Sequence, residues 1–291
     1  MQPLRGRRRR RGVTLVELIV VLTIAGILLG ALGRVLWAGM RFYQAQSQIL
    51  DVQQNVRAVA QILPIELREL DAGDGDIVAL SDTAVTVKAM RGFAVVCAPP
   101  SVARAQVTVR NALTYGYRAM DAARDSVLVF REGDPGLSAD DRWLRAPIAA
   151  IAPAGCADGS AGTRLTLTGM VGGATQLDSV LQGAPLRTFE TVNYRLYDDG
   201  AGAWWFGVRT HSAGSWSSTS PIAGPLRPRD GLRFEYRDDA GGVTTTRTAV
   251  ARIRITVRGR SLIPIRIPGR RPGFYEDSLS TQIAVRNSAR S

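Results

Sequence analysis

The chain has 291 residues, of which 45% are hydrophobic, so it can form one large folded domain or two smaller ones. Its formal net charge is +12, but six arginines among the first eleven residues supply half of that, leaving 12 − 6 = +6 for the rest. The total charge is therefore weak evidence for nucleic-acid binding, and a single histidine with no C-x-x-C pair argues against a zinc site.

The first predicted element is an apolar helix that follows the arginine block. Residues 13–32 are twenty residues with one charged side chain, Glu17. At 1.5 Å per residue such a helix spans about 30 Å, which is the thickness of the hydrocarbon core of a bilayer. Because the arginines lie on one side only, the positive-inside rule keeps Met1 in the cytoplasm and places the remainder of the chain across the membrane.

Glu17 distinguishes this segment from a secretory signal peptide or a plain membrane anchor. Neither alternative explains an acid that costs about 2.5–3.5 kcal/mol near the centre of a membrane helix and less near an end. Cleavage between Gly12 and Val13 would create a positive α-amino group four residues before Glu17, on the same helix face. This amine, from the same or a neighbouring chain, is the partner that we predict for the carboxylate.

Residues 11–30, RGVTLVELIVVLTIAGILLG, resemble the class III signal of type IV prepilins and type II secretion pseudopilins. The resemblance rests on the basic leader, Gly12 before the cut, Glu17 as the fifth mature residue and the apolar helix. It implies cleavage after Gly12 by a prepilin peptidase and N-methylation of Val13. The first mature residue of this family is usually phenylalanine, and here it is Val13. The resemblance also implies assembly with other pilins or pseudopilins through helix packing.

A second helical pattern continues the first towards a globular head. Apolar residues recur at spacings of three and four at Ile49, Val52, Val56, Val59, Leu63, Leu67 and Leu70. This stripe predicts one helix over residues 13–70, about 85 Å long, with a transmembrane part at 13–36 and an amphipathic part at 37–70. We expect Pro64 to kink the helix or to start a new turn.

Residues 71–291 predict a β-rich head, which makes the fold class α+β. Strands are expected at residues 83–90, 93–97, 125–133, 163–169, 251–259 and 279–287, and hairpins at 191–210 and 232–248. In residues 251–259 the apolar side chains alternate with arginines, so one face of that strand is expected to be buried. We expect two sheets, or a sandwich, packed on the amphipathic half of the helix.

Cys97 and Cys156 are the two cysteines of the chain. If the head lies outside the cytoplasm, a disulfide between them is favoured. The alternative is a pair of buried thiols.

Candidate chemistry in the head is sparse. The lone His211 is interpreted as a residue of a polar loop rather than a catalytic base. Two acidic loops offer oxygen ligands for calcium, although acidic turns are the commoner explanation; their carboxylates are Asp71, Asp74 and Asp76, and Asp134, Asp140 and Asp141. An arginine face suits DNA as a less favoured partner; it consists of Arg252, Arg254, Arg258 and Arg260, with Arg270 and Arg271 nearby. No catalytic residues, cofactor or metal are predicted.

The C-terminal half carries a weaker resemblance, to the larger minor pilins and pseudopilins of the W and J types. It rests on ELREL at the helix end, on residues 232–259 and on STQIAVRN near the C-terminus, while residues 98–183 resemble nothing familiar. The two resemblances together imply a filament subunit in the bacterial inner membrane, with its N-terminus cytoplasmic and its head periplasmic. The alternative function is a membrane-anchored binding module for DNA uptake or adhesion that uses the β head.

Overall fold

The computed structural model describes residues 14–134, 136–137, 140–212, 214–266 and 271–285. A single helix, α1 (Leu15–Arg68), leads into an antiparallel β head, so the α+β prediction is confirmed. The helix has 54 residues and passes through Pro64 without ending. Pro64 lies four residues before the end of α1, so the missing donor affects only the last turns of the helix.

Fourteen strands are present among the described residues, all paired in antiparallel fashion. They are β1 (Ile77–Leu80), β2 (Ala84–Ser101), β3 (Gln106–Arg110), β4 (Tyr115–Gly116), β5 (Asp125–Arg131), β6 (Arg142–Gly155), β7 (Ala161–Leu167), β8 (Pro185–Asp198), β9 (Trp204–Ser212), β10 (Ser215–Trp216), β11 (Ser220–Leu226), β12 (Leu232–Arg237), β13 (Arg252–Arg260) and β14 (Glu276–Ala284). Four short 3-10 helices lie between them: η1 (Val102–Arg104), η2 (Asn111–Leu113), η3 (Ala174–Ser179) and η4 (Arg247–Ala249).

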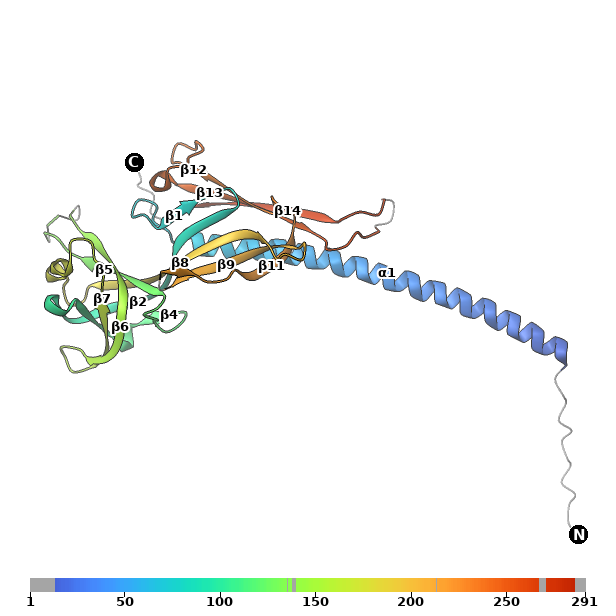
Figure 1. Cartoon of the computed structure of the whole chain (residues 1–291), viewed down its shortest axis with the longest axis horizontal. Coiled ribbons are helices and arrows are strands. Elements are labelled where there is room, and N and C mark those ends of the chain that lie inside the picture. The colour runs from blue at the N-terminus through green and yellow to red at the C-terminus, as the bar shows by residue number, and fades with distance from the viewer. Residues whose placement is uncertain (1–13, 135, 138–139, 213, 267–270, 286–291) are drawn as a thin grey trace, which may run out of the picture.

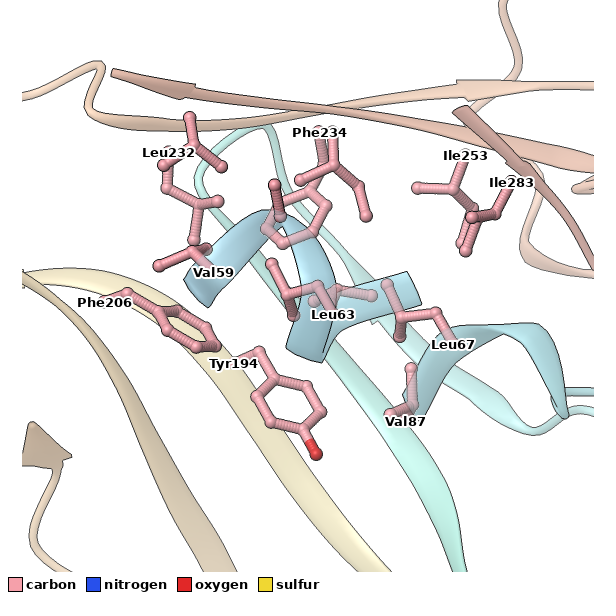
Figure 2. Packing of buried hydrophobic residues seen from close by; sticks show 14 of the residues in the cluster. Val59, Leu63, Leu67, Val87, Tyr194, Phe206, Leu232, Phe234, Ile253 and Ile283 are labelled. Carbon is pink, nitrogen blue, oxygen red and sulfur yellow. The ribbon is translucent and has the colours of Figure 1, made fainter. Parts of the chain in front are cut away.

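The head has two lobes, each with its own apolar core. In the first, which we call the helix lobe, the second half of α1 lies between β12, β13 and β14 on one side and β2, β8, β9 and β11 on the other. Figure 2 shows Leu63 of the helix between Phe234 and Ile253 on one side and Tyr194 and Phe206 on the other. The predicted stripe on α1 is therefore the centre of this core.

The second lobe, which we call the outer lobe, lies beyond the C-terminal end of α1 (Figure 1). It is built from β3, β5, β6 and β7 with the ends of β2 and β8, and its core contains Val107, Val127, Leu165 and Leu186. The long strands β2 and β8 pair from Ala84↔Arg195 to Val95↔Pro185, so they run through both lobes and join them.

Two predictions about the strands need correction. Residues 83–90 and 93–97 form one continuous strand, β2, because β8 pairs with it on both sides of an irregularity between Met90 and Gly92. The expected hairpin at residues 232–248 is also wrong, since β12 pairs instead with β13, and residue Val243 makes only an isolated bridge to Arg237. The threonine-rich run after Val243 has no alternating apolar residues, whereas Ile253 and Ile255 supply an apolar face.

The predicted alternation of residues 251–259 is confirmed in β13. Ile253, Ile255 and Val257 are fully buried, and Arg252 and Arg254 are exposed. The hairpin predicted over residues 191–210 is present as β8 and β9.

Candidate functional site

The first turn of α1 holds the predicted assembly residue. Thr14 caps the helix in an extended conformation, with φ −77° and ψ 150°, and its Oγ1 accepts a hydrogen bond from the Glu17 backbone N at 3.2 Å. Thr14 and Glu17 have the T-x-x-E spacing of a capping box. The carboxylate thus lies in the first turn, where the positive end of the helix dipole favours an anion. Gly12 and Val13, the predicted processing residues, lie outside the described residues.

The capping threonine was missed in the sequence analysis, although its signal is present. A threonine three residues before a glutamate, directly ahead of an apolar run, is the sequence pattern of a helix start. The cap explains why Glu17 lies at the beginning of the helix rather than within it. This placement keeps the carboxylate next to the chain position at which the predicted new amine would arise.

The first half of α1 has no partner in the described part of the chain. None of its most apolar 18-residue window is buried, and this window is long and apolar enough to cross a membrane. Leu15 is 76% exposed and Ile27 is 72% exposed. An exposed helix that is apolar on all faces is stable in a lipid environment but not in water.

Small residues in this half leave room for a second helix. A Cβ atom built on Gly26, Gly30 or Gly33 would meet no atom within 4 Å. The Thr23 hydroxyl donates to the Ile19 carbonyl at 2.7 Å, so its polar group is satisfied inside the helix. Small residues at such positions allow close packing of helices in membranes.

The second half of α1 is fixed by the head. Val52, Val59 and Leu63 are fully buried. The backbone of Gly259 in β13 comes so close that a Cβ atom there would lie 2.7 Å from both Val52 Cγ1 and Val56 Cγ2. Glycine at this position therefore allows the strand to lie directly on the helix.

A chain of ion pairs ties the end of α1 to the junction of the lobes. Glu66 of the helix pairs with Arg91 of β2 at 3.0 Å, and Arg91 pairs in turn with Glu190 of β8 at 3.2 Å. Tyr194 donates a hydrogen bond to Glu66 at 2.7 Å. Burial alone would lower the pKa of Arg91, but Glu66 and Tyr194 outweigh it and raise that pKa.

The ion-pair chain continues into the outer lobe. Arg118 contacts Glu190 at 3.3 Å and Asp125 at 2.7 Å. The Asp125 side chain is 1% exposed; its carboxylate pairs with Arg118 and accepts a hydrogen bond from the Asp121 backbone N at 2.8 Å. Sequence reasoning missed this network, because no pattern pairs charges as far apart as Glu66 and Arg91, at 25 residues, or Arg91 and Glu190, at 99 residues.

In the first acidic loop, at residues 71–76, two carboxylates accept hydrogen bonds from the backbone of the loop itself. Asp76 Oδ2 accepts from the Asp71 backbone N at 2.9 Å, and Asp71 Oδ1 accepts from the Asp74 backbone N at 3.0 Å. The Lys88 ammonium donates to the Gly75 carbonyl in the same loop. Burial raises the pKa of Asp76 and lowers that of Lys88 to about 8. The loop is thus a turn that accepts a hydrogen bond from Lys88, the one lysine in the sequence.

The second acidic loop has the same character. Asp140 Oδ2 accepts from the Asp134 backbone N at 2.8 Å, and Asp141 Oδ1 accepts from the Gly133 backbone N at 3.2 Å. Within the described ranges, no group of three or more acids, histidines or cysteines is arranged to hold a metal ion.

The arginine face of β13 is largely paired with acids. Arg254 lies 3.6 Å from Glu235, and Arg258 lies 3.5 Å from Asp230. Arg260 lies 3.9 Å from Glu276. These carboxylates compete with phosphate groups for the arginines, so the face offers little support for DNA binding. Arg270 lies outside the described residues.

His211 lies in β9, which corrects the prediction of a loop. Its ring packs edge-on against Trp216 at 5.2 Å, because β10 turns back and pairs with the end of β9. The histidine is therefore part of a ring contact between two strands.

The cysteines lie in the outer lobe and form a disulfide. Cys97 of β2 bonds to Cys156, which follows β6, with a Cα–Cα distance of 5.1 Å. The bridge closes a segment with a sequence separation of 59 that contains β3, β5 and β6. It therefore ties β2 to the end of β6 within the outer lobe.

Comparison with known families gives one match. Residues 7–33 match the prokaryotic N-terminal methylation motif, which covers the arginine run and the exposed start of α1 and says nothing of the head. No curated protein and no solved structure matches the chain. The motif and the apolar helix together support a membrane-inserted precursor of the pilin or pseudopilin type.

Proposed function

We propose that this chain is a structural, non-enzymatic subunit, a minor pilin or minor pseudopilin, of a type IV pilus or a type II secretion filament. A prepilin peptidase cleaves it after Gly12, Val13 becomes the methylated N-terminus, and the mature chain is drawn from the inner membrane into a helical fibre. Subunits pack through the apolar half of α1, and Glu17 of one chain pairs with the terminal amine of the same or a neighbouring chain.

The observation that carries this proposal is the exposed half of α1. It combines the methylation motif with an apolar surface that the rest of the described chain leaves uncovered. Among the described residues no side chain pairs with the Glu17 carboxylate in its first turn, whose backbone N donates to Thr14, and a terminal amine next to that turn would supply a partner in a medium of low dielectric constant. A contact that repeats from one subunit to the next without closing on itself builds a fibre.

The remaining parts of the proposal follow the order of the chain. Residues 1–12 are the cytoplasmic leader, 13–36 span the inner membrane, 37–70 carry the helix into the head, and 71–291 form the periplasmic head. The disulfide suits that oxidising compartment. We place the subunit among the larger W or J types, near the filament tip, where the outer lobe is free of the neighbours that a subunit in the body of the filament must accommodate.

The test replaces Glu17 by glutamine, which removes the charge and keeps the shape. We expect the Glu17→Gln chain to be cleaved and inserted normally but to be lost from the sheared or purified filament fraction. Asp51→Asn is the matched control, because Asp51 is an exposed acid on the same helix outside the first turn. Normal incorporation of Glu17→Gln would contradict the proposed pairing.

Mass spectrometry of the N-terminus tests the processing step. The mature wild-type chain should begin at Val13 and carry one methyl group, and Gly12→Ala should retain the leader. Efficient removal of the leader from Gly12→Ala would contradict cleavage by a prepilin peptidase.

A further inference from the structure

The connection between β13 and β14 extends the sheet beyond the head. Ser261 N donates to the Tyr275 carbonyl at 2.9 Å, and Ile265 and Gly273 exchange two backbone hydrogen bonds at 2.8 and 3.1 Å. We call the described residues 261–266 and 271–275 the basic hairpin. Figure 1 shows this hairpin running along α1 towards the exposed half of the helix.

Contacts with α1 fix the level of the hairpin along the helix. Gly259 lies on Val52 and Val56, and the Leu262 backbone N donates to Gln48 Oε1 at 3.2 Å. From Gly259 to Leu262 the strand advances by three residues, or about 10 Å. Over the same step its contact point on α1 moves about six residues, or about 9 Å, towards the N-terminus of the helix. Continued at this pitch, Arg266 reaches about the level of helix residue 40, just outside the segment proposed to span the membrane.

The side chains of the hairpin are apolar and basic. Leu262 is 54% exposed, Ile263 is 52% exposed and Phe274 is 44% exposed. Arg266 and Arg271 are exposed as well, and among the described residues neither has a carboxylate partner. Residues 261–275 contain no acid. This differs from β13, whose arginines are paired with Glu235, Asp230 and Glu276.

The neighbouring part of α1 has the same chemistry. The Arg41 guanidinium lies 3.4 Å from the centroid of the Trp37 ring, and Trp37 is 55% exposed. Arg260, at the base of the hairpin, stacks on Phe274 at 3.8 Å. Aromatic rings with arginines are typical of the boundary between lipid and water, where the rings lie among the headgroups and the guanidinium groups contact phosphates.

We propose that the basic hairpin binds the anionic headgroups of the membrane in which α1 is inserted. This inference rests on the proposed function, since it needs α1 to span the bilayer. The hairpin would then be a second membrane contact that fixes the rotation and tilt of the head before assembly, and that must be released when the subunit leaves the membrane. A lipid surface fits better than an acidic protein, because the apolar and basic residues lie together at the height of the bilayer surface.

The experiment measures hydrogen exchange of the full chain in lipid nanodiscs. One sample contains phosphatidylcholine alone, and the other contains a mixture of phosphatidylcholine and phosphatidylglycerol. Peptides from residues 260–276 should exchange more slowly in the anionic discs, and added salt should weaken this protection. Two arginines near an anionic surface correspond to a preference of about 30-fold.

Variants test whether the protection requires the arginines of the hairpin or any exposed positive charge on the head. The double variant Arg266→Gln and Arg271→Gln should lower protection in anionic discs to the level found in phosphatidylcholine. Arg252→Gln is the matched control, because Arg252 is an exposed arginine at the opposite end of β13, and it should leave protection unchanged.

The outcomes distinguish this inference from the proposed function. If residues 15–36 are not protected in either disc, α1 does not span the bilayer and the proposed function fails. If those residues are protected but the hairpin exchanges equally in both lipids, only the headgroup contact is overturned. Hairpin protection that depends on the number of chains per disc, and not on lipid charge, would assign the surface to a second copy and would also overturn it.

Discussion

The two halves of α1 belong to one unbroken helix but differ in almost every physical respect. Leu15 to Gln44 is apolar and uncovered, whereas from Ala45 onward one stripe is buried between two groups of strands. The glycines of the first half face open space, while Gly259 of β13 is pressed against Val52 and Val56 in the second. The head therefore defines the position of the second half completely and places no restriction on the packing of the first.

If the chain assembles as proposed, folding and assembly use separate residues of one element. The second half contributes its stripe to the head core, so it cannot leave without unfolding the head. The first half can exchange a lipid environment for a bundle of similar helices, because both surroundings satisfy an apolar surface. Substitutions in the two halves should therefore have effects that can be separated by experiment.

The largest expected effect comes from a matched pair of leucines. Leu63 is fully buried, so Leu63→Ala should destabilise the head by about 3–5 kcal/mol. Leu28 is 63% exposed, and Leu28→Ala should leave head unfolding unchanged. Denaturation of both variants in detergent, followed by tryptophan fluorescence of the head, checks this contrast. Equal losses in both variants would mean that the first half also packs on the head.

Removal of the disulfide tests whether the stability of the outer lobe depends on the buried second half of α1. Replacement of both Cys97 and Cys156 by alanine removes a crosslink with a sequence separation of 59, which should cost about 2–4 kcal/mol. Hydrogen exchange should accelerate in β3, β6 and β7, while amides of Val52 to Leu67 keep their protection. Faster exchange throughout α1 would show instead that the two lobes unfold as one unit.

Gly259 probes the fit between β13 and the helix. Gly259→Val should cost about 1–3 kcal/mol through overpacking, because its Cβ would lie 2.7 Å from Val52 and Val56. The double variant with Val52→Ala should recover part of the loss. Gly155→Val is the matched control, since a Cβ at Gly155 in β6 meets no atom within 4 Å. A destabilised control, or no rescue, would contradict a contact specific to the helix.

The smallest expected effect concerns Lys88, which lies beside the turn that follows the buried second half of α1. Burial lowers its pKa from the ordinary 10.5 to about 8, with Arg145 adding to the shift and Asp76 opposing it. Between these two values the unfolded chain binds the proton and the folded chain does not, so stability should rise with pH. The gain should be about 1 kcal/mol per pH unit near pH 9.

Lys88→Met should remove that dependence. Thermal midpoints of the wild type and the variant, measured from about pH 7 to pH 9.5, check the prediction. The raised pKa values of Tyr194 and Tyr236 act in the opposite direction only at higher pH, where unfolded tyrosines ionise. Parallel pH profiles for the two chains would rule out Lys88 as the titrating group.

The sequence predicts those parts of the molecule whose information is local. The stripe that includes Leu63 and the alternation in β13 follow from spacings of two to four residues. The pairing of β12 with β13 was missed because an Asp/Gly turn suggested a nearer partner. The Glu66–Arg91 contact could not be predicted, since single charged residues on distant elements carry no pattern until the fold brings them together.

The long pairing of β2 with β8 has a mechanical consequence. Both strands pass from the helix lobe into the outer lobe, and their register is continuous from Ala84↔Arg195 to Val95↔Pro185 apart from one irregularity. A tensile force on the N-terminus enters the head through α1, and the ion pairs at Arg91 connect that helix to both strands. Force transmitted along the strands loads many backbone hydrogen bonds at once, in shear rather than by peeling. If the chain is drawn into a filament through α1 as proposed, this pairing would keep the two lobes together while the helix is pulled.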